Sequence, residues 1–238
     1  MNPSFFRSLE VLLTTERLDA YRQDKVGPAV TLARYLWNMA LCEALYSPLQ
    51  LAEVALRNSI HREFSARAKT DTWYDVLSNQ LPSWQNDQLT HAKQTLVADG
   101  KPITPGRVVA ALSFGFWTGF LNKTHAGNGL GHTLAHRAFA QAPRSERDLK
   151  KLDARWREIR DLRNRVFHHE RIIHWSNLPA QHRTLLETIG WMSPEALVLA
   201  STLDRFGPTY QQGLAPYLAQ IRQHWPDTSS SAKTNSAP

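Results

Sequence analysis

The amino-acid sequence predicts an all-α fold. Apolar residues recur three or four positions apart over long stretches, which is the spacing of one face of a helix. One such row is Leu49, Ala52, Leu56, Ile60 and Phe64. Signals for the start of a helix also recur, in which a serine or threonine precedes a proline, as in Ser47-Pro48 and Thr104-Pro105. No stretch alternates between apolar and polar residues for long enough to predict a strand.

The expected helices follow from this spacing and from the caps. The first covers about residues 15–23, and the second, 28–46, carries Leu32, Leu36 and Met39 on one face. Ser47, Pro48 and Gln50 have the pattern of a capped helix start, so we expect a separate helix at 48–68. The remaining expected helices are 72–79, 83–98, 105–121, 129–140, 145–169, 178–190, 194–205 and 208–224.

The chain is expected to form one domain. Its 238 residues are enough to bury a substantial core, and neither an internal repeat nor a linker-like stretch is apparent. We therefore expect a single helical domain over residues 1–225. Residues 226–238 are polar and rich in serine, so they have little to bury and are expected to be disordered.

The charge balance favours a polyanionic partner. The chain has 28 Lys+Arg against 21 Asp+Glu, a formal net charge of +7. Between Arg144 and Arg171 there are ten basic and six acidic residues, so this segment carries +4 of that charge. The interleaved carboxylates leave a second interpretation open, a solvated helix face covered by ion pairs.

The sequence is typical of a protein of the reducing cytoplasm. Cys42 is the single cysteine, which excludes an internal disulfide and a cysteine-rich zinc site. Arg7 and Glu10 interrupt any apolar core at the N-terminus, so no signal peptide is expected. The longest apolar run, 108–121, is too short for a bilayer, and we expect no membrane segment.

Residues that suit metal-free phosphate chemistry gather between positions 163 and 169. Histidine, present as His168 and His169, is a residue type that can give or take a proton, and Arg163 presents a planar fork of donors to phosphate oxygens. Asn164 adds a donor and an acceptor. Arg163 also borders the apolar stripe of its expected helix, where a charge is costly unless it is paired.

Helical geometry does not by itself bring these residues together. Asn164 and His168 share a face, as do Arg165 and His169, but residues five apart, such as Arg163 and His168, lie about 140° apart. A long arginine side chain, a bent helix end, or a second copy of the site across a dimer would be needed to bring them together. The plainer interpretation is a polar helix end whose histidines complement the helix dipole, and spacing alone leaves both open.

Two other groups of polar residues have simpler structural interpretations. Glu53, Arg57 and His61 form one polar row, most simply a local Glu53–Arg57 ion pair, although Arg57-Asn58 repeats Arg163-Asn164 and supports a role beside the main motif. His132 and His136 have the spacing of a metal pair but lack a third ligand of the expected type. The two histidines are more simply surface residues, so we expect no metal. No phosphate loop or dinucleotide fingerprint is present, so we expect no nucleotide cofactor.

Four blocks of sequence, in order, accompany the motif at 163–169, which lies in the last of them. They begin with Thr15-Glu16-Arg17-Leu18, Tyr46-Ser47-Pro48-Leu49 (continuing to Arg57-Asn58), Leu112-Ser113-Phe114-Gly115 and Leu162-Arg163-Asn164-Arg165. Together they resemble the bacterial Abi-like (abortive infection) family of the HEPN superfamily, and Arg163-Asn164-x-x-x-His168 is similar to the Arg-x4-His signature of HEPN domains. The resemblance extends from about residue 15 to residue 194. Arg171 departs from the pattern, because proline is expected after His-His-Glu.

The resemblance implies a HEPN-like helical bundle and a metal-independent endoribonuclease of phage defence or toxin type. His168 would move protons at the 2′-OH or the leaving 5′-oxygen, and Arg163 would hold the phosphate. Asn164 would orient these groups, and His169 would share the proton transfer or bind. The residues expected to attract the RNA backbone are Arg160, Arg165 and Arg171.

The resemblance also implies partners. HEPN nucleases commonly pair two protomers so that both motifs line one cleft, so we expect a homodimer. A neutralising RNA or protein antitoxin is a further expected partner. The alternative is a non-catalytic helical module that binds RNA or protein and cleaves nothing, because one fold hosts many functions.

Overall fold

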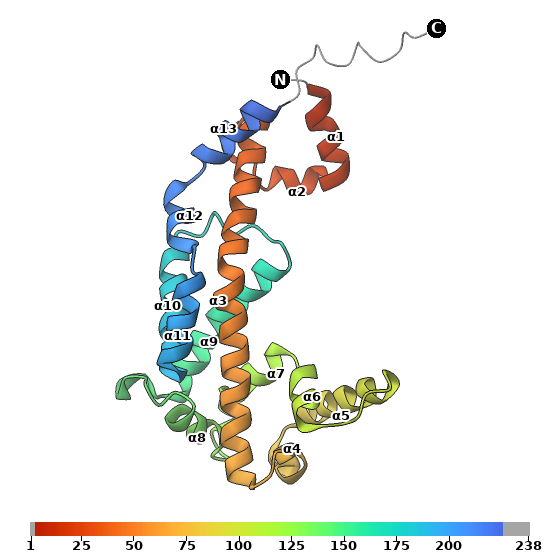
Figure 1. Cartoon of the computed structure of the whole chain (residues 1–238), viewed down its shortest axis with the longest axis vertical. Helices are drawn as coiled ribbons and strands as arrows, with labels where there is room; N and C mark the ends of the chain where they lie inside the picture. Colours follow the sequence, from red (N-terminus) through yellow and green to blue (C-terminus); the bar gives the residue numbers. More distant parts are fainter. Residues whose placement is uncertain (1–2, 226–238) are drawn as a thin grey trace. The chain divides into compact units, whose positions relative to one another are not determined.

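The structure, a computed structural model, describes residues 3–225, and its regular elements over this range are all helices, joined by turns and loops (Figure 1). It includes no β-strand within that range, so the predicted all-α class is confirmed. The expected tail at 226–238 lies outside the described residues. No helix between residues 3 and 225 has both the length and the apolar character that crossing a bilayer requires.

The elements are α-helices, with short 3-10 turns between some of them. The α-helices are α1 (Pro3–Leu13), α2 (Thr15–Asp19), α3 (Pro28–Ala68), α4 (Trp73–Val76), α5 (Ser83–Ala98), α6 (Pro105–Ala111), α7 (Phe114–Gly119), α8 (Leu130–Arg137), α9 (Leu149–Phe167), α10 (Leu178–Met192), α11 (Pro194–Leu203), α12 (Phe206–Gln212) and α13 (Ala215–His224). The 3-10 turns are η1 (Gln23–Lys25), η2 (Ser78–Gln80), η3 (Lys123–His125) and η4 (Arg144–Glu146).

The chain divides into two compact units, each built from separate segments. Of the described residues, unit 1 contains 3–45, Arg165–Leu178 and 205–225, and unit 2 contains Tyr46–Asn164 and Pro179–Asp204. The divisions after Leu45 and after Asn164 both fall inside helices, α3 and α9. No linker sequence therefore marks the units.

The expected helix break at Pro48 is wrong. Pro48 lies inside α3, which runs without interruption for 41 residues. A proline inside a helix removes a backbone donor and costs roughly 3 kcal/mol. Leu45 on one side of it and Leu49 and Ala52 on the other are at most 1% exposed, and we attribute the continuity of α3 to burial on both sides.

The expected helix at 105–121 divides into α6 and α7. Leu112 and Ser113 are extended between them, and the Ser113 hydroxyl accepts a hydrogen bond from Phe116 N at 3.2 Å. A serine that caps its neighbour in this way starts a new helix, and this local competition with the longer helix is the reason for the difference. The expected helix at 208–224 also divides, into α12 and α13. Gly213 lies between them with a φ of 60°.

Unit 2 has an aromatic core. The ring of Phe64 on α3 meets Trp73 and Phe120 edge-on at centroid distances of 5.0 and 4.9 Å. Phe114 on α7 packs against Trp156 on α9 with centroids 6.0 Å apart. Edge-on contacts of this kind add to the free energy of burying large rings. This core holds α3, α7 and α9 together and so positions the side chains they share.

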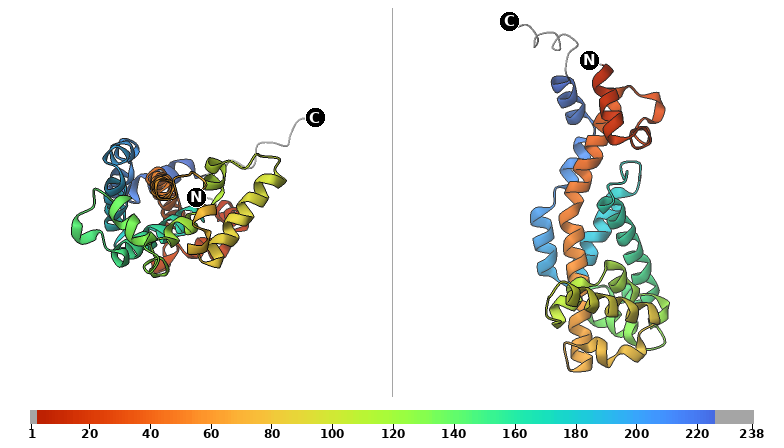
Figure 2. Two further views of the ribbon diagram at one scale, coloured as in Figure 1. Left: turned by 90° about the horizontal axis from the view of Figure 1, so that it is seen from below. Right: turned by 90° about the vertical axis from the view of Figure 1, so that its right-hand side faces the viewer.

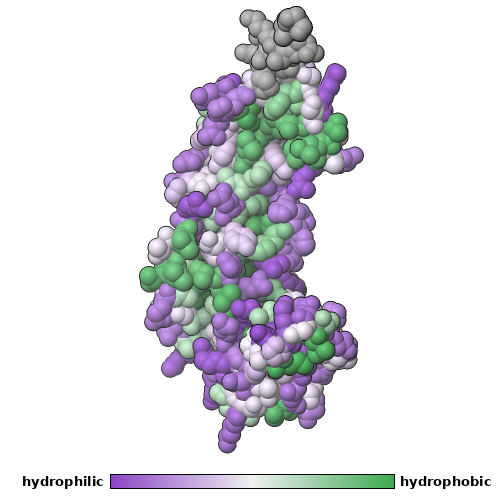
Figure 3. All heavy atoms as spheres, turned by 45° about the vertical axis from the view of Figure 1, so that its right-hand side comes forward, coloured by the Kyte–Doolittle hydropathy of each residue, from purple (hydrophilic) through white to green (hydrophobic). Residues whose placement is uncertain are grey.

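Unit 1 packs α1, α2 and α13 beside the N-terminal part of α3 (Figure 2). Its apolar cluster comprises Phe6, Leu18, Ala29, Leu32 and Trp225. Apolar side chains also reach the surface around α1 (Figure 3), where Val11 and Leu12 are 87% and 76% exposed.

Candidate functional site

The Arg-x4-His motif lies at the end of α9, where the division between the units falls. Arg163 and Asn164 belong to unit 2, and the chain from Arg165 through His168 and His169 to Arg171 belongs to unit 1. The residues of the motif are therefore described separately for each unit.

In unit 2, Arg163 is a half-buried cation with a carboxylate partner. Its Nε donates to Glu53 Oε2 at 3.2 Å, and both side chains are about one-quarter exposed, at 25% and 23%. Its guanidinium carbon also lies 5.9 Å from the centroid of the Phe114 ring. A charge beside the core is thus compensated, as burial requires. The structure brings Glu53 and Arg163 together, which helical spacing alone could not establish.

The local interpretation of the Glu53 row is wrong, because Glu53 pairs with Arg163 and not with Arg57. Arg57 Nε is buried and has no hydrogen-bond partner among the described residues. Asn58 is exposed and Asn164 half-buried. At the far end of the row, His61 Nδ1 accepts from Trp73 Nε1 at 3.0 Å, and burial lowers the pKa of His61.

Arg160, expected to bind the RNA backbone, is anchored to α7. Its Nη1 donates to the hydroxyl of the buried Thr118 at 3.3 Å, and the residue is half-buried. A guanidinium carries five N–H donors, so this bond leaves the rest of the fork for other acceptors.

In unit 1, α9 ends two residues earlier than the sequence predicts. His168 follows the last helical residue, and His169 adopts the left-handed conformation with a φ of 57°. His169 N donates to Val166 O at 3.2 Å and Glu170 N to Arg165 O at 2.9 Å. This pair of bonds is a Schellman cap, in which glycine usually occupies the left-handed position. The cap ends the helix before the two histidines, so both lie in the turn, exposed.

The segment after the cap is fixed by Asn38 on α3. Asn38 Nδ2 donates to Glu170 O at 3.1 Å, and Asn38 Oδ1 accepts from Ile172 N at 2.7 Å and from Ile173 N at 3.3 Å. Asn38 is 3% exposed. Sequence reasoning missed this residue. The available signal was an asparagine three and seven residues before two members of an apolar row, Leu41 and Leu45, both of which are buried.

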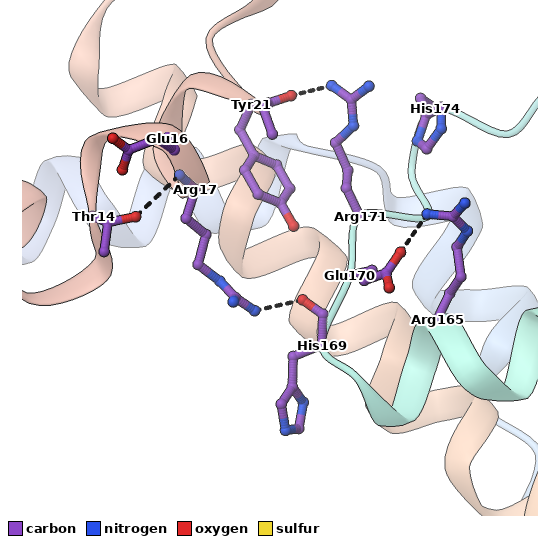
Figure 4. A pocket seen from close by; sticks show the side chains of 10 residues that line it. Thr14, Glu16, Arg17, Tyr21, Arg165, His169, Glu170, Arg171 and His174 are labelled. Carbon is purple, nitrogen blue, oxygen red and sulfur yellow. Dashed lines mark hydrogen bonds and ion pairs between the residues drawn. The ribbon is translucent and has the colours of Figure 1, made fainter.

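A pocket of about 600 Å³ opens beside this turn, entirely within unit 1 (Figure 4). Arg17 on α2 donates to the His169 carbonyl, Arg171 donates to the Ala20 carbonyl, and Arg165 pairs with Glu170. His169 lines the pocket, whereas His168 is not among its lining residues. The lining comprises Thr14, Glu16, Arg17, Ala20, Tyr21, Arg165, His169, Glu170, Arg171 and His174.

Two titratable groups of the pocket are perturbed. Burial and the charges of Arg171 and Arg165 lower the pKa of His174. Burial, opposed in part by Arg17 and Arg171, raises the pKa of Tyr21 to about 12. Near neutral pH the Tyr21 hydroxyl is therefore protonated and able to donate.

Comparison with known proteins was negative throughout. No family model, no curated protein and no solved structure matches the chain. The roles of the site residues therefore rest on their chemistry and surroundings.

The described residues include no group of three or more His, Cys, Asp or Glu side chains arranged to hold a metal ion. His132 and His136 are exposed, and their rings meet edge-on at 4.6 Å. His125 is buried, with Nε2 2.8 Å from Gln85 Oε1 and Nδ1 3.2 Å from Asn128 Nδ2. Burial lowers the pKa of His125 to about 4, so it is a neutral core residue.

Proposed function

We propose that the protein is a metal-independent endoribonuclease with a HEPN-like helical domain. The observation that carries the proposal is the fixed position of Arg163, a half-buried arginine held by Glu53 five residues before an exposed histidine. A solvated helix end would not need such a partner. Proton-transfer groups and a held phosphate ligand on one short segment are what phosphodiester cleavage without a metal requires.

The proposed reaction is transesterification at an RNA phosphodiester. The ribose 2′-oxygen attacks the adjacent phosphorus as its proton is removed, and the bond from phosphorus to the 5′-oxygen breaks. The products are a 2′,3′-cyclic phosphate and a 5′-hydroxyl end that gains a proton. DNA lacks the 2′-OH and should be spared.

Each residue of the motif has a proposed role. Arg163 binds the phosphate and stabilises the charge that develops on it. His168 acts as base on the 2′-OH or as acid on the 5′-oxygen, and Asn164 orients the reacting groups. His169 shares the proton transfer or binds the strand, with Arg160, Arg165 and Arg171 attracting the backbone.

The proposal extends to assembly and setting. Two protomers would contribute their motifs to one cleft, and the activity would serve phage defence or a toxin restrained by an RNA or protein antitoxin. The expected setting is the cytoplasm. These expectations come from the resemblance to Abi-like proteins.

The test is cleavage of a single-stranded RNA by purified protein in EDTA. We expect His168→Ala and Arg163→Gln each to lower the cleavage rate by about 100- to 10,000-fold. His91→Ala is the matched control, because His91 is an exposed histidine on α5 in unit 2. Circular dichroism verifies the fold of each variant. Equal cleavage by all four proteins would reject the proposed site, and His169→Ala separates the roles of the two neighbouring histidines.

The alternative, a non-catalytic binding module, is favoured by one observation. The carboxylate of Glu53 already neutralises Arg163, as in a purely structural ion pair. In that case RNA would bind with strong salt dependence and remain intact, and His168→Ala would leave the affinity unchanged.

A further inference from the structure

The pocket beside the α9 cap gathers cationic side chains from two parts of unit 1. Figure 4 shows Arg17 and Tyr21 on α2 and the segment just after it, facing Arg165, Arg171 and His174 from the chain after Asn164. Its volume of about 600 Å³ falls within the range of ligand pockets.

Two of its arginines are held in place without being neutralised. Arg17 and Arg171 each donate to a backbone carbonyl, that of His169 and that of Ala20. Such bonds orient a guanidinium but leave its full charge, because the acceptor is neutral. Of the two carboxylates in the lining, Glu170 is paired with Arg165, and Glu16 is exposed. Three arginines against two glutamates leave the lining a formal charge of +1, with Arg17 and Arg171 held in fixed orientations.

The hydroxyl of Tyr21 adds a neutral donor between these charges. Tyr21 is 2% exposed, and Figure 4 shows it between Arg17 and Arg171. Within residues 3–225 its hydroxyl forms no hydrogen bond. The hydroxyl oxygen itself is accessible, so it can donate to a ligand oxygen in the pocket.

The backbone of the pocket is strained on both sides. Thr14 has a φ of 65° and His169 a φ of 57°, two of the five non-glycine residues with positive φ that the structure describes. The conformation is unfavourable for a β-branched residue such as threonine. Strained residues persist where the surrounding structure enforces them, which occurs most often at functional sites.

We propose that this pocket is a phosphate-binding subsite for a nucleotide unit. Arginine forks and a tyrosine hydroxyl match the acceptor oxygens of a phosphate group, and two of the donors are already oriented. The phosphate comes from an RNA strand or from a free nucleotide. The RNA case rests on the proposed function, because it adds a second phosphate contact to the same strand.

The binding test compares adenosine 5′-monophosphate with adenosine by calorimetry. We expect the wild-type protein to prefer the monophosphate. Arg171→Gln should weaken its binding by about tenfold or more, and Tyr21→Phe by about threefold to tenfold. Tyr21→Phe keeps the ring and its edge-on contact with Tyr35 at 5.2 Å, so it should fold. Arg222→Gln on α13 is the matched control, an exposed arginine of unit 1 outside the pocket.

The same variants, combined with His168→Ala to prevent cleavage, are then titrated with a six-nucleotide single-stranded RNA. Parallel losses for RNA and monophosphate support the subsite on an RNA strand. A loss for the monophosphate alone supports a pocket for free nucleotides and overturns the RNA source. Equal affinity for monophosphate and adenosine, or pocket variants that bind like Arg222→Gln, would overturn the proposal.

These outcomes separate the subsite from the ribonuclease. A protein that binds the monophosphate through Tyr21 and Arg171 but never cleaves RNA rejects only the proposed function. A protein whose cleavage depends on His168 while its phosphate affinity ignores Tyr21 and Arg171 rejects only the subsite.

Discussion

Arg163 illustrates how a single charged residue gains a defined position. Its sequence neighbours suggest only that it borders the apolar stripe of a helix. The partner that compensates it, Glu53, lies 110 positions earlier in the chain. A pairing over this separation depends on how α3 and α9 pack, and no local pattern encodes it.

The Glu53–Arg163 pair should contribute measurable coupling to stability. Glu53→Gln leaves Arg163 without its carboxylate, and the double variant with Arg163→Gln removes both charges. Because the pair is partly screened by solvent, we expect a coupling energy of about 1 kcal/mol in a double-mutant cycle. Urea unfolding of the four proteins measures it. Strictly additive effects would show that the two side chains do not interact in solution.

At the scale of elements, helix existence was easier to predict than helix ends. The rows of apolar residues located α3, α5 and α9, because burial of one face determines where a helix forms. Local start signals were ambiguous. Ser47-Pro48 has the pattern of a helix start yet lies inside α3, whereas Ser113 does start α7, where its hydroxyl accepts a hydrogen bond from Phe116 N.

The cap of α9 yields a prediction about strain. His169 occupies a left-handed position that costs most L-residues roughly 1 kcal/mol, and glycine avoids that cost. We expect His169→Gly to match or exceed the wild type in free energy of unfolding, and His169→Val to fall about 1–2 kcal/mol below it.

Denaturant unfolding of both variants checks this expectation, with His168→Gly and His168→Val as the matched pair one residue earlier. Glycine should maintain or raise the free energy of unfolding at His169, where the backbone is left-handed, but not at His168, where the backbone is not left-handed. Equal glycine effects at the two positions would contradict the Schellman cap.

At the scale of the whole molecule, the fold class followed from the sequence but the division into units did not. Periodicity and caps are local and predict helices. Unit 1 joins three distant segments, and two of its boundaries lie inside α3 and α9, where no change in composition marks them. The pocket residues Arg17 and Tyr21 were missed for the same reason, since their role depends on a segment about 150 positions later.

The stability of the whole molecule should decline in mild acid. Burial is the largest cause of the lowered pKa of four histidines, His61, His125, His174 and His182. Each binds fewer protons when folded than when unfolded, so stability is complete above about pH 6.5 and is lost as the pH falls. For His125, with a folded pKa of about 4, the loss is complete below that value.

The measurement is the free energy of unfolding at pH 7 and pH 5, for the wild type and His125→Gln. At pH 5 the penalty from His125 is on the order of 2 kcal/mol, and the variant should lack it. Glutamine keeps a polar group near Gln85 and Asn128, so the comparison within each protein remains meaningful. An identical pH dependence in both proteins would assign the acid sensitivity to other groups.

The hydrogen bonds between Asn38 and the segment after the α9 cap should affect how fast the amide hydrogens of that segment exchange with solvent. The amides of Ile172 and Ile173 lie outside any helix, yet both donate to the buried side chain of Asn38. Their hydrogen atoms should exchange with solvent slowly, as helical amides do, although the segment has the appearance of a loop. If the proposed subsite binds a phosphate, the neighbouring backbone that Asn38 already holds would lose little conformational entropy, and more of the contact energy would remain as affinity.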